Sequence, residues 1–376
     1  MQSNKLRMAI RATAAVAVFG MVAQANAAVT IDTEGYEANV YGFARIATTY
    51  DFDENIANGG QAGNFSKIMT TADGHFGMDA NTSRLGVQVM TPQDVKMVVE
   101  FDFDGSDGLD PRLRHAYGSY NGVLIGRTWS NYNSFVGNTS GLDFDGPPGL
   151  AGTQGRTEQI RYTSGPFSVS AEEPVDYTGI VGAGAAPKTG TPAFTARLED
   201  SQGGLSYSAA VMAKQTSSDD GNIDDSAIGH GAFLAGKVAI SDMLSIQGAV
   251  NFSDGANAYV YRAGGNFGQI DAYLDGNNIE TVESYGGALG ASLALGGGSS
   301  VNLGYGTAIV NLDDAVQAGA VAATLTDTNS MIFVNYQWVP IKDVKMGVEF
   351  ANLKTETQGG DDRDANRVMF LAQYSF

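Results

Sequence analysis

The chain has 376 residues, of which 41 are acidic and 22 basic, so its formal net charge at pH 7 is −19. Such a charge excludes nucleic-acid binding, because phosphates attract a basic surface. The chain has no cysteine, which excludes a disulfide framework and a thiolate metal site.

The first residues have the pattern of a secretory signal. Lys5, Arg7 and Arg11 precede an apolar run at 12–23, and Ala25-Asn26-Ala27 follows as a small-residue cleavage site. The run is shorter than the roughly 20 residues that a membrane-spanning helix needs. We therefore expect residues 1–27 to be a signal peptide and residues 28–376 to form one domain.

Sixteen segments then alternate between apolar and polar residues, which is the period of a β-strand. Turn signals such as Asn121-Gly122 join some of them closely, whereas other connections are long. An even strand number with short turns at one end and long loops at the other is typical of outer-membrane barrels. In chain order the segments are 40–50, 82–90, 95–103, 112–120, 123–129, 157–163, 167–172, 193–199, 205–214, 232–240, 244–252, 282–295, 301–310, 331–338, 344–353 and 367–376.

The last segment shows the two faces clearly. Arg367 and Gln373 lie on one face, and the other carries Val368, Phe370, Ala372, Tyr374 and Phe376. A soluble β-sandwich also alternates, but it keeps edge strands, which lipid does not tolerate. Aromatic residues near strand ends, such as Trp338, suit a membrane interface. The sequence therefore predicts an all-β fold, a closed antiparallel transmembrane β-barrel of about 16 strands whose polar faces line a water-filled lumen.

Basic residues gather on the face predicted to line the lumen in the first six segments. A guanidinium group can hold a carboxylate through two parallel hydrogen bonds, so we expect an anion-binding ladder on one wall. The alternative is that acids such as Glu100, Asp102 and Glu158 pair with these groups and leave little net field. The predicted set is Arg45, Arg84, Lys96, Arg112, Arg114, Arg127 and Arg161, with Arg156 at the end of the third long loop.

Several stretches resemble the DcaP-like porins: VYGFARIATTYDF (40–52), TSRLGVQV (82–89), RHAYGSYNGVLIGRTWSNY (114–132) and GRTEQIRYTSGPFSVS (155–170). The terminal Phe376 resembles the assembly signal of such barrels. This resemblance implies a homotrimer in the outer membrane of a Gram-negative bacterium, in contact with lipid and lipopolysaccharide, that takes up dicarboxylates and other small organic anions. Some members have an N-terminal coiled coil, but the segment before residue 40 lacks heptads.

The long segment 130–156 is predicted to be functional because connections of this length are uncommon. Its resemblance to the constriction loop of trimeric porins implies that it folds into the lumen. Asp143 and Asp145 would then lie opposite the arginines. Opposite charges across a narrow gap would orient dipolar and anionic solutes.

The sequence gives little support for a metal site or a catalytic site. The acidic stretches 102–110 and 218–225 lack the bidentate glutamate of a calcium loop. His230 lies near Asp225 and Ser226 but has no nucleophile motif around it. We expect no enzyme activity, no cofactor and no metal site.

A second function stays open, namely a plugged structural or adhesive barrel whose acidic surface loops are the working part. Residues 253–281 suit either role; they include Tyr259, Tyr261, Arg262 and Tyr273.

Overall fold

The computed structural model describes residues 29–58, 62–68, 74–105, 110–175, 179–221, 223–267 and 270–376. The expected signal peptide, residues 1–27, lies outside them. Within the described ranges no helix is long and apolar enough to cross a membrane.

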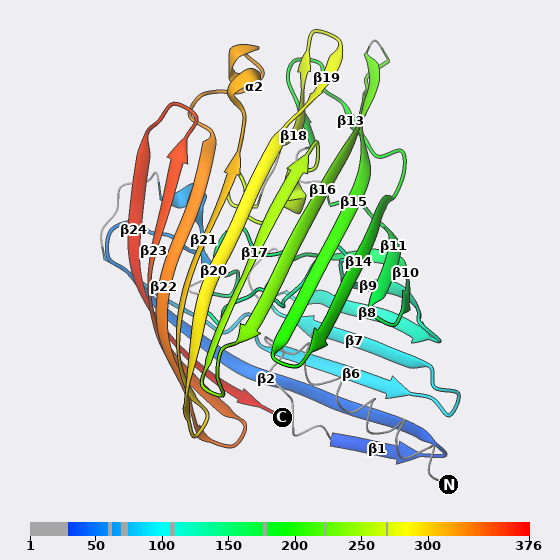
Figure 1. Cartoon of the computed structure of the whole chain (residues 1–376), viewed down its shortest axis with the longest axis vertical. Helices are drawn as coiled ribbons and strands as arrows, with labels where there is room; N and C mark the ends of the chain where they lie inside the picture. The colour runs from blue at the N-terminus through cyan, green and yellow to red at the C-terminus, as the bar shows by residue number, and fades with distance from the viewer. Residues whose placement is uncertain are drawn as a thin grey trace.

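Sixteen antiparallel strands form a closed ring (Figure 1). Each strand pairs with its neighbour in the chain, and β24 pairs back onto β2. The predicted barrel is therefore confirmed. The ring strands are β2 (Tyr36–Asp51), β6 (Arg84–Met90), β7 (Lys96–Asp102), β8 (Arg112–Tyr120), β9 (Val123–Trp129), β10 (Arg156–Ser164), β11 (Phe167–Glu172), β14 (Ala193–Gln202), β15 (Leu205–Asp219), β16 (Asp224–Ala239), β17 (Leu244–Asp254), β20 (Glu283–Gly296), β21 (Ser299–Val310), β22 (Thr326–Ile341), β23 (Val344–Thr357) and β24 (Asp362–Ser375).

The last residue closes the ring. The Phe376 N–H donates to the Gly42 carbonyl at 3.0 Å, and the Gly42 N–H donates to the Phe376 carbonyl at 3.1 Å. An unpaired strand edge would be costly in lipid because no water is there to satisfy it. This is why the alternation of the final segment continues to the end of the chain.

Short turns lie at one end of the ring and long loops at the other (Figure 1). The β8–β9 turn has positive φ at Asn121 (47°) and Gly122 (83°), as the two-residue hairpin turn requires. The smaller elements are β1 (Val29–Thr33), β3 (Ala57–Asn58), β4 (Ala62–Gly63), β5 (His75–Asp79), β12 (Gly179–Val181), β13 (Pro187–Lys188), β18 (Ile270–Asp275), β19 (Asn278–Thr281), the 3-10 turns η1 (Phe65–Lys67) and η2 (Asn257–Tyr259), and α2 (Asp313–Gln317).

Several strands are longer than the alternation indicated. β16 begins at Asp224 and β24 at Asp362, eight and five residues before the predicted starts. At their loop ends these strands keep their hydrogen-bonded ladder, as in the Asp219–Asp224 pair. A strand that extends beyond the bilayer has water on its outer side and needs no apolar outer face, so the period-2 signal disappears there. The segment before residue 40 also differs from expectation, because β1 pairs with the first residues of β2.

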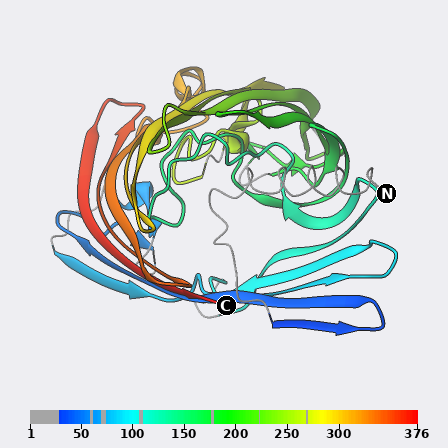
Figure 2. The same cartoon turned by 60° about the horizontal axis from the view of Figure 1, so that its bottom comes forward.

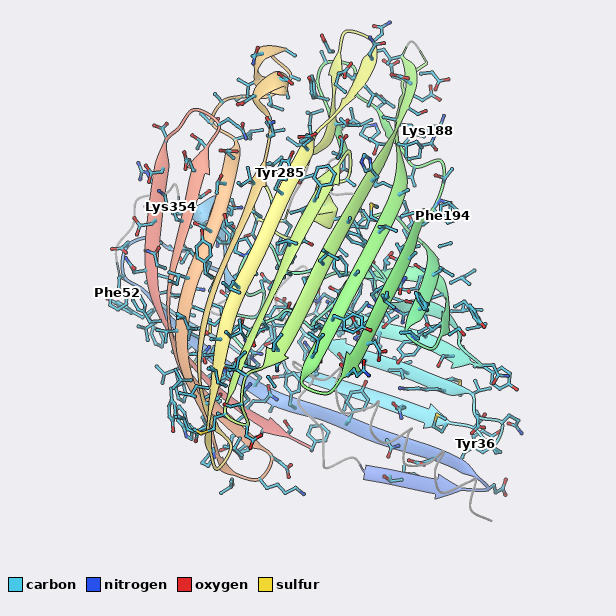
Figure 3. The ribbon with its side chains drawn as sticks, in the orientation of Figure 1. Tyr36, Phe52, Lys188, Phe194, Tyr285 and Lys354 are labelled. Carbon is cyan, nitrogen blue, oxygen red and sulfur yellow. The ribbon has the colours of Figure 1, made fainter. Side chains whose placement is uncertain are left out.

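The outer faces are apolar, as predicted. Phe194 and Tyr285 project from the wall (Figure 3) and are 58% and 43% exposed. On β22, Ile332, Val334 and Tyr336 are exposed and the intervening residues are buried. Lipid would cover this surface.

The inner face is not polar throughout, which corrects the prediction of a uniformly wet lumen. Met331 and Phe333 of β22 and Leu353 of β23 pack against Ile56 and Phe65 of the first long loop. Loops that fold inward supply a second apolar layer, so the strands behind them can carry apolar residues on both faces. On β24, Met369 and Leu371 likewise pack against Leu142.

Candidate functional site

The segment 130–156 between β9 and β10 is bonded to strands on the far side of the ring. The Asn335 side chain of β22 donates to the Ser140 carbonyl at 2.8 Å. The Asn251 side chain of β17 donates to the Gly149 carbonyl at 2.8 Å and accepts from the Gly152 N–H at 2.9 Å. Figure 2 shows this teal segment inside the ring of strands. These bonds agree with the inward fold that the sequence resemblance implied.

Gly149 lies directly against the wall. Its φ is +74°, and a Cβ atom there would collide with the backbone of Gly287 on β20 and Thr307 on β21. Both the positive φ and the lack of space for a Cβ atom require a glycine at this position.

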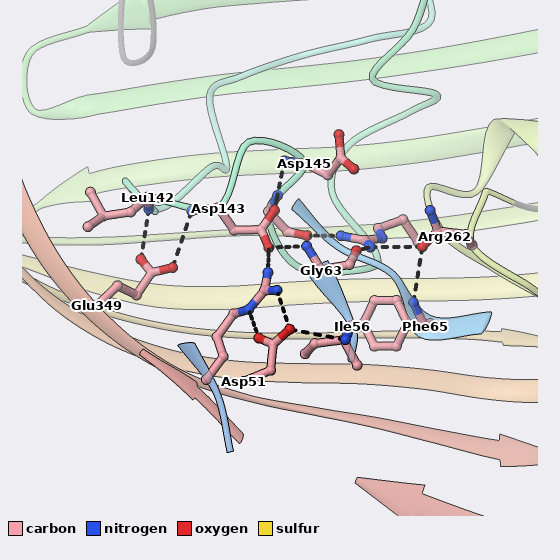
Figure 4. Close-up of polar contacts among 12 residues, drawn as sticks. Asp51, Ile56, Gly63, Phe65, Leu142, Asp143, Asp145, Arg262 and Glu349 are labelled. Atoms are coloured by element: carbon pink, nitrogen blue, oxygen red, sulfur yellow. Dashed lines mark hydrogen bonds and ion pairs between the residues drawn. The ribbon is translucent and has the colours of Figure 1, made fainter. Parts of the chain in front are cut away.

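Glu349 of β23 anchors the middle of the segment (Figure 4). Its carboxylate accepts the N–H of Leu142 at 2.7 Å, the N–H of Asp143 at 3.2 Å and the side-chain amide of Asn335 at 2.8 Å. The residue is 2% exposed. Hydrogen bonds to a carboxylate are stronger than those to a neutral acceptor, and three donors meet at this one. Glu349 therefore contributes most of the strength of the contact between β23 and the segment.

Asp143 lies within this packed layer and contacts groups outside the predicted arginine set, although Arg45 of that set lies within electrostatic range. Its carboxylate accepts the Gly63 N–H at 2.7 Å and lies 3.6 Å from Arg367 of β24. Arg367 also pairs with Asp51 at 2.8 Å. The carboxylate thus joins the first long loop, segment 130–156 and β24.

Arg262 completes the layer from the loop after β17. Its guanidinium donates to the carbonyls of Gly146, at 2.7 Å, and of Gly63, and to the Asn266 side chain at 2.9 Å. The Tyr261 hydroxyl donates to the Asp145 carbonyl at 2.9 Å. This part of 253–281 therefore has an inward, structural role.

Asp145 retains a carboxylate outside the ion pairs found among the described residues. Burial raises its pKa to about 6; Arg262 opposes this shift, and Asp143 and Asp104 add to it. Arg112 of the arginine wall lies within electrostatic range. Asp145 is therefore the acidic group of this segment whose charge can vary near neutral pH.

Three predicted arginines are paired with acids on neighbouring strands. Arg112 holds Asp102 through two hydrogen bonds of 2.9 and 2.8 Å. Arg114, almost fully buried, bridges Glu100 and Asp102. Arg84 lies 3.6 Å from Glu100. These three arginines therefore follow the alternative that acids of the lumen pair with the basic groups and leave little net field.

Arg45 and Arg156 have no ion pair among the residues that the structure describes. Arg45 donates to the Leu142 carbonyl at 2.8 Å, and its buried Nε has no partner in that part of the chain. Arg156 stacks over the Trp129 ring with its guanidinium carbon 4.4 Å from the ring centre. It lies within electrostatic range of Arg84, Arg112 and Arg114.

Arg127 lies on the outer face, so its assignment to the lumen is wrong. It pairs with Glu158 at 2.8 Å, and this pair shares a face with the exposed Ile125 and Ile160. Irregular pairing of β7 with β8 between Glu100 and Phe101 shifts the alternation after Arg114. A bulge of this kind reverses the parity of the residues beyond it.

Lys96 and Arg161 lie on the inner face near the short turns, below the segment 130–156. They line one depression with Ser119 and Leu124. The structure thus divides the eight predicted cations among a paired cluster, two unpaired arginines, this lower pair and one outer residue.

Lys345, Glu349, Arg367 and Arg197 also carry charge on the inner face but were absent from the predicted site. Parity alone places Lys345 and Glu349 there, since the exposed Val348 and Phe350 occupy the other face of β23. Nothing in the sequence shows that Glu349 meets residues more than 200 positions away.

The described residues do not bring a hydrolytic triad together. His230 is exposed beside the Phe252 ring, and the Asp225 carboxylate accepts the N–H groups of Ile279 and Ser226. Likewise, within the described ranges no three His, Asp or Glu side chains are grouped to hold a metal.

Comparisons with known proteins agree with this architecture. The model of the DcaP outer membrane protein family matches residues 18–376. The crystal structure of the outer membrane channel DcaP of Acinetobacter baumannii has a TM-score of 0.81 and 28% identity, covering 92% of this chain and 99% of that one. No curated protein sequence matches the chain significantly.

Two further structures share the fold alone. An anion-selective porin from Comamonas acidovorans has a TM-score of 0.56 and 14% identity, covering 91% of this chain and 100% of that one. For OmpF of Salmonella typhi the TM-score is 0.55 and the identity 11%, covering 92% and 100%.

Proposed function

The chain belongs to the DcaP outer membrane protein family, and from this premise we propose that it passes small hydrophilic solutes by diffusion and prefers organic anions such as dicarboxylates. It is a sixteen-stranded barrel of the Gram-negative outer membrane and a member of a channel family. Such a family indicates transport and not catalysis.

The unpaired state of Arg45 and Arg156 is the observation that supports the anion preference. Both groups lie beside the paired cluster of Arg84, Arg112 and Arg114, which already holds its own acids. An anion that reaches Arg156 would replace part of its lost hydration by guanidinium hydrogen bonds. The acidic groups of the rim do not cancel this effect, because salt screens charges more than about 8 Å apart at physiological ionic strength.

The arrangement of the inward loops supports a constriction. Segment 130–156 is fixed to β17, β22 and β23, and its Asp145 lies within electrostatic range of Arg112. The field between them would orient a dipolar solute during passage.

The selectivity test is the reversal potential of single channels in a potassium chloride gradient. We expect Arg156→Gln and Arg45→Gln each to lower the chloride-to-potassium permeability ratio by about twofold or more. Arg127→Gln makes the same chemical change on the outer face and should leave the ratio unchanged. Equal ratios in all four proteins would contradict the proposal. Liposome swelling with succinate against neutral butanediol then tests the solute class.

A homotrimer is the second part of the proposal, and the short wall supports it. β6, β7 and β9 have seven residues each, fewer than the roughly 9–11 that a membrane-spanning strand needs. The wall also presents the Arg127–Glu158 pair outward, and an arginine facing lipid at mid-depth costs about 2–4 kcal/mol. We infer that this wall contacts other copies of the chain, whereas lipid and lipopolysaccharide surround the long strands.

We also propose that residues 1–27 direct export and are removed, since that basic and apolar pattern suits a protein of the outer membrane.

The plugged-barrel alternative has one observation in its favour, namely the apolar packing of inward loops against β22 and β23. A plugged barrel would show no steady conductance steps in a planar bilayer. Steps in the purified protein would exclude it.

A further inference from the structure

The inner wall has a depression near the short turns, at the opposite end from the long loops. Its volume is about 260 Å³, which is large enough for a small organic acid. The lining comes from β7, β8, β9 and β10 and from the turns that join them: Asp94, Lys96, Ser119, Tyr120, Asn121, Gly122, Leu124, Arg161 and Thr163.

Strand register aligns the two cations of this depression. Lys96 pairs with Ser119, Ser119 with Leu124 and Leu124 with Arg161, so the four residues form one row across the wall. Three strand spacings separate the Cα atoms of Lys96 and Arg161 by about 14 Å. Both side chains are long enough to lean over Ser119 and approach the two ends of one molecule.

Among the described residues, neither the Lys96 nor the Arg161 side chain forms an ion pair. Two acids within electrostatic range of Arg161 are hydrogen-bonded to other residues. Glu172 accepts from Ser130 and Asn131, and Glu199 accepts from Ser134.

Asp94 is the one carboxylate in the lining. It is exposed on the turn between β6 and β7 and forms no ion pair within the described ranges. The hydroxyl groups of Ser119 and Thr163 and the Asn121 amide add neutral hydrogen-bonding groups. The lining thus combines two cations, several neutral polar groups and one acid at the rim.

We propose that this depression is a second anion site, through which a small dicarboxylate leaves the pore, with one carboxylate on Arg161 and the other near Lys96. The inference rests on the proposed function and deepens it. A second weak site below the arginine wall would divide the path into two shorter steps, as conduction requires sites that also release their ligand. The bidentate geometry of Arg161 makes carboxylate the preferred group.

The experiment uses the fact that the chain has no cysteine. In full-length Ser119→Cys channels the single thiol would lie between the two cations. We compare its rates of reaction with an anionic reagent, sulfonatoethyl methanethiosulfonate, and with the cationic trimethylammonium analogue, each divided by the rate of the same reagent with free 2-mercaptoethanol. We expect the anionic reagent to react roughly tenfold faster, and millimolar succinate to slow it.

Lys96→Gln together with Arg161→Gln should abolish both the rate difference and the protection by succinate. Lys237→Gln, which removes a cation from β16 outside the depression, is the matched control. If succinate fails to protect, or if the double variant keeps the rate difference, the inference is overturned. Thr163→Cys serves as a second reporter if Ser119→Cys does not assemble.

Reversal potentials of the same channels separate this result from the proposed function. Anion preference without protection at Ser119→Cys would reject the exit site alone. If the unmodified channel shows no anion preference, the proposed function is rejected.

Discussion

Glu349 offers a direct test of how the inward segment is held. Glu349→Leu removes the acceptor of the Leu142 and Asp143 N–H groups and of the Asn335 amide. A hydrogen bond to a charged group contributes about 1.5–3 kcal/mol, and a buried donor left unpaired adds a further cost. Counting only the two backbone donors at the lower value gives about 3 kcal/mol. Because each 1.4 kcal/mol is a factor of ten, local detachment should become about a hundredfold more frequent.

Glu349→Gln gives a graded comparison. An amide oxygen at the Oε2 position keeps the bonds from Leu142 and Asn335, and only the Asp143 N–H meets a mismatched amino group. We therefore expect a loss of about one hydrogen bond, or 1–3 kcal/mol. Glu356→Leu, on the opposite face of β23, is the control for an acid-to-leucine change.

Hydrogen exchange of the peptide that contains Leu142 and Asp143 measures the detachment, and open-channel noise reports it in function. Protection should fall about a hundredfold in Glu349→Leu, by less in Glu349→Gln and not at all in Glu356→Leu. Noise should follow the same order. Exchange and noise like those of the unmodified protein in Glu349→Leu would refute the anchoring role of this carboxylate.

Two further predictions concern charge. Burial raises the pKa of Asp145 to about 6, so its carboxyl group is mostly neutral below that pH. The chloride-to-potassium permeability ratio should therefore rise as the pH falls from 7.5 to 5, and Asp145→Asn should remove this dependence. A variant with the same pH profile as the unmodified protein would count against the role of Asp145. Glu158→Arg places two arginines side by side on the short wall, and we expect native mass spectra to shift from trimer toward monomer. A mass distribution like that of the unmodified protein would show that this wall is not the interface.

Much of the fold could be predicted from local pattern. All sixteen ring strands overlap the segments that period-2 alternation predicted, and the Asn121-Gly122 turn has the expected backbone angles. The lipid-facing side of β24 was also correct. In a barrel each strand must show one face to lipid, so every segment carries the signal in its own residues.

The candidate site was less predictable. Arg127 was placed in the lumen, although within its own segment, 123–129, it has the same parity as Val123 and Ile125, which face outward. The irregularity near Arg114, beyond which the faces of β8 reverse, has no sequence marker. Asp143, which was expected to face the arginines, binds Gly63 and lies beside Arg367, with Arg45 of the predicted set within electrostatic range. These differences concern which residues meet, and not which residues are charged.

By itself, the sequence determined the strand number, the alternation that gives each strand one lipid-facing side and the presence of many basic residues on the inner side of the first six. These follow from the hydrophobic effect acting on each residue separately, and a single chain records them. Only the tertiary structure decided which of those cations are paired, because ion pairing depends on distances between strands and loops far apart in the chain. The contact of Leu142 with Glu349 and the free state of Arg156 within the described residues exist only once the ring has closed and its loops have folded inward.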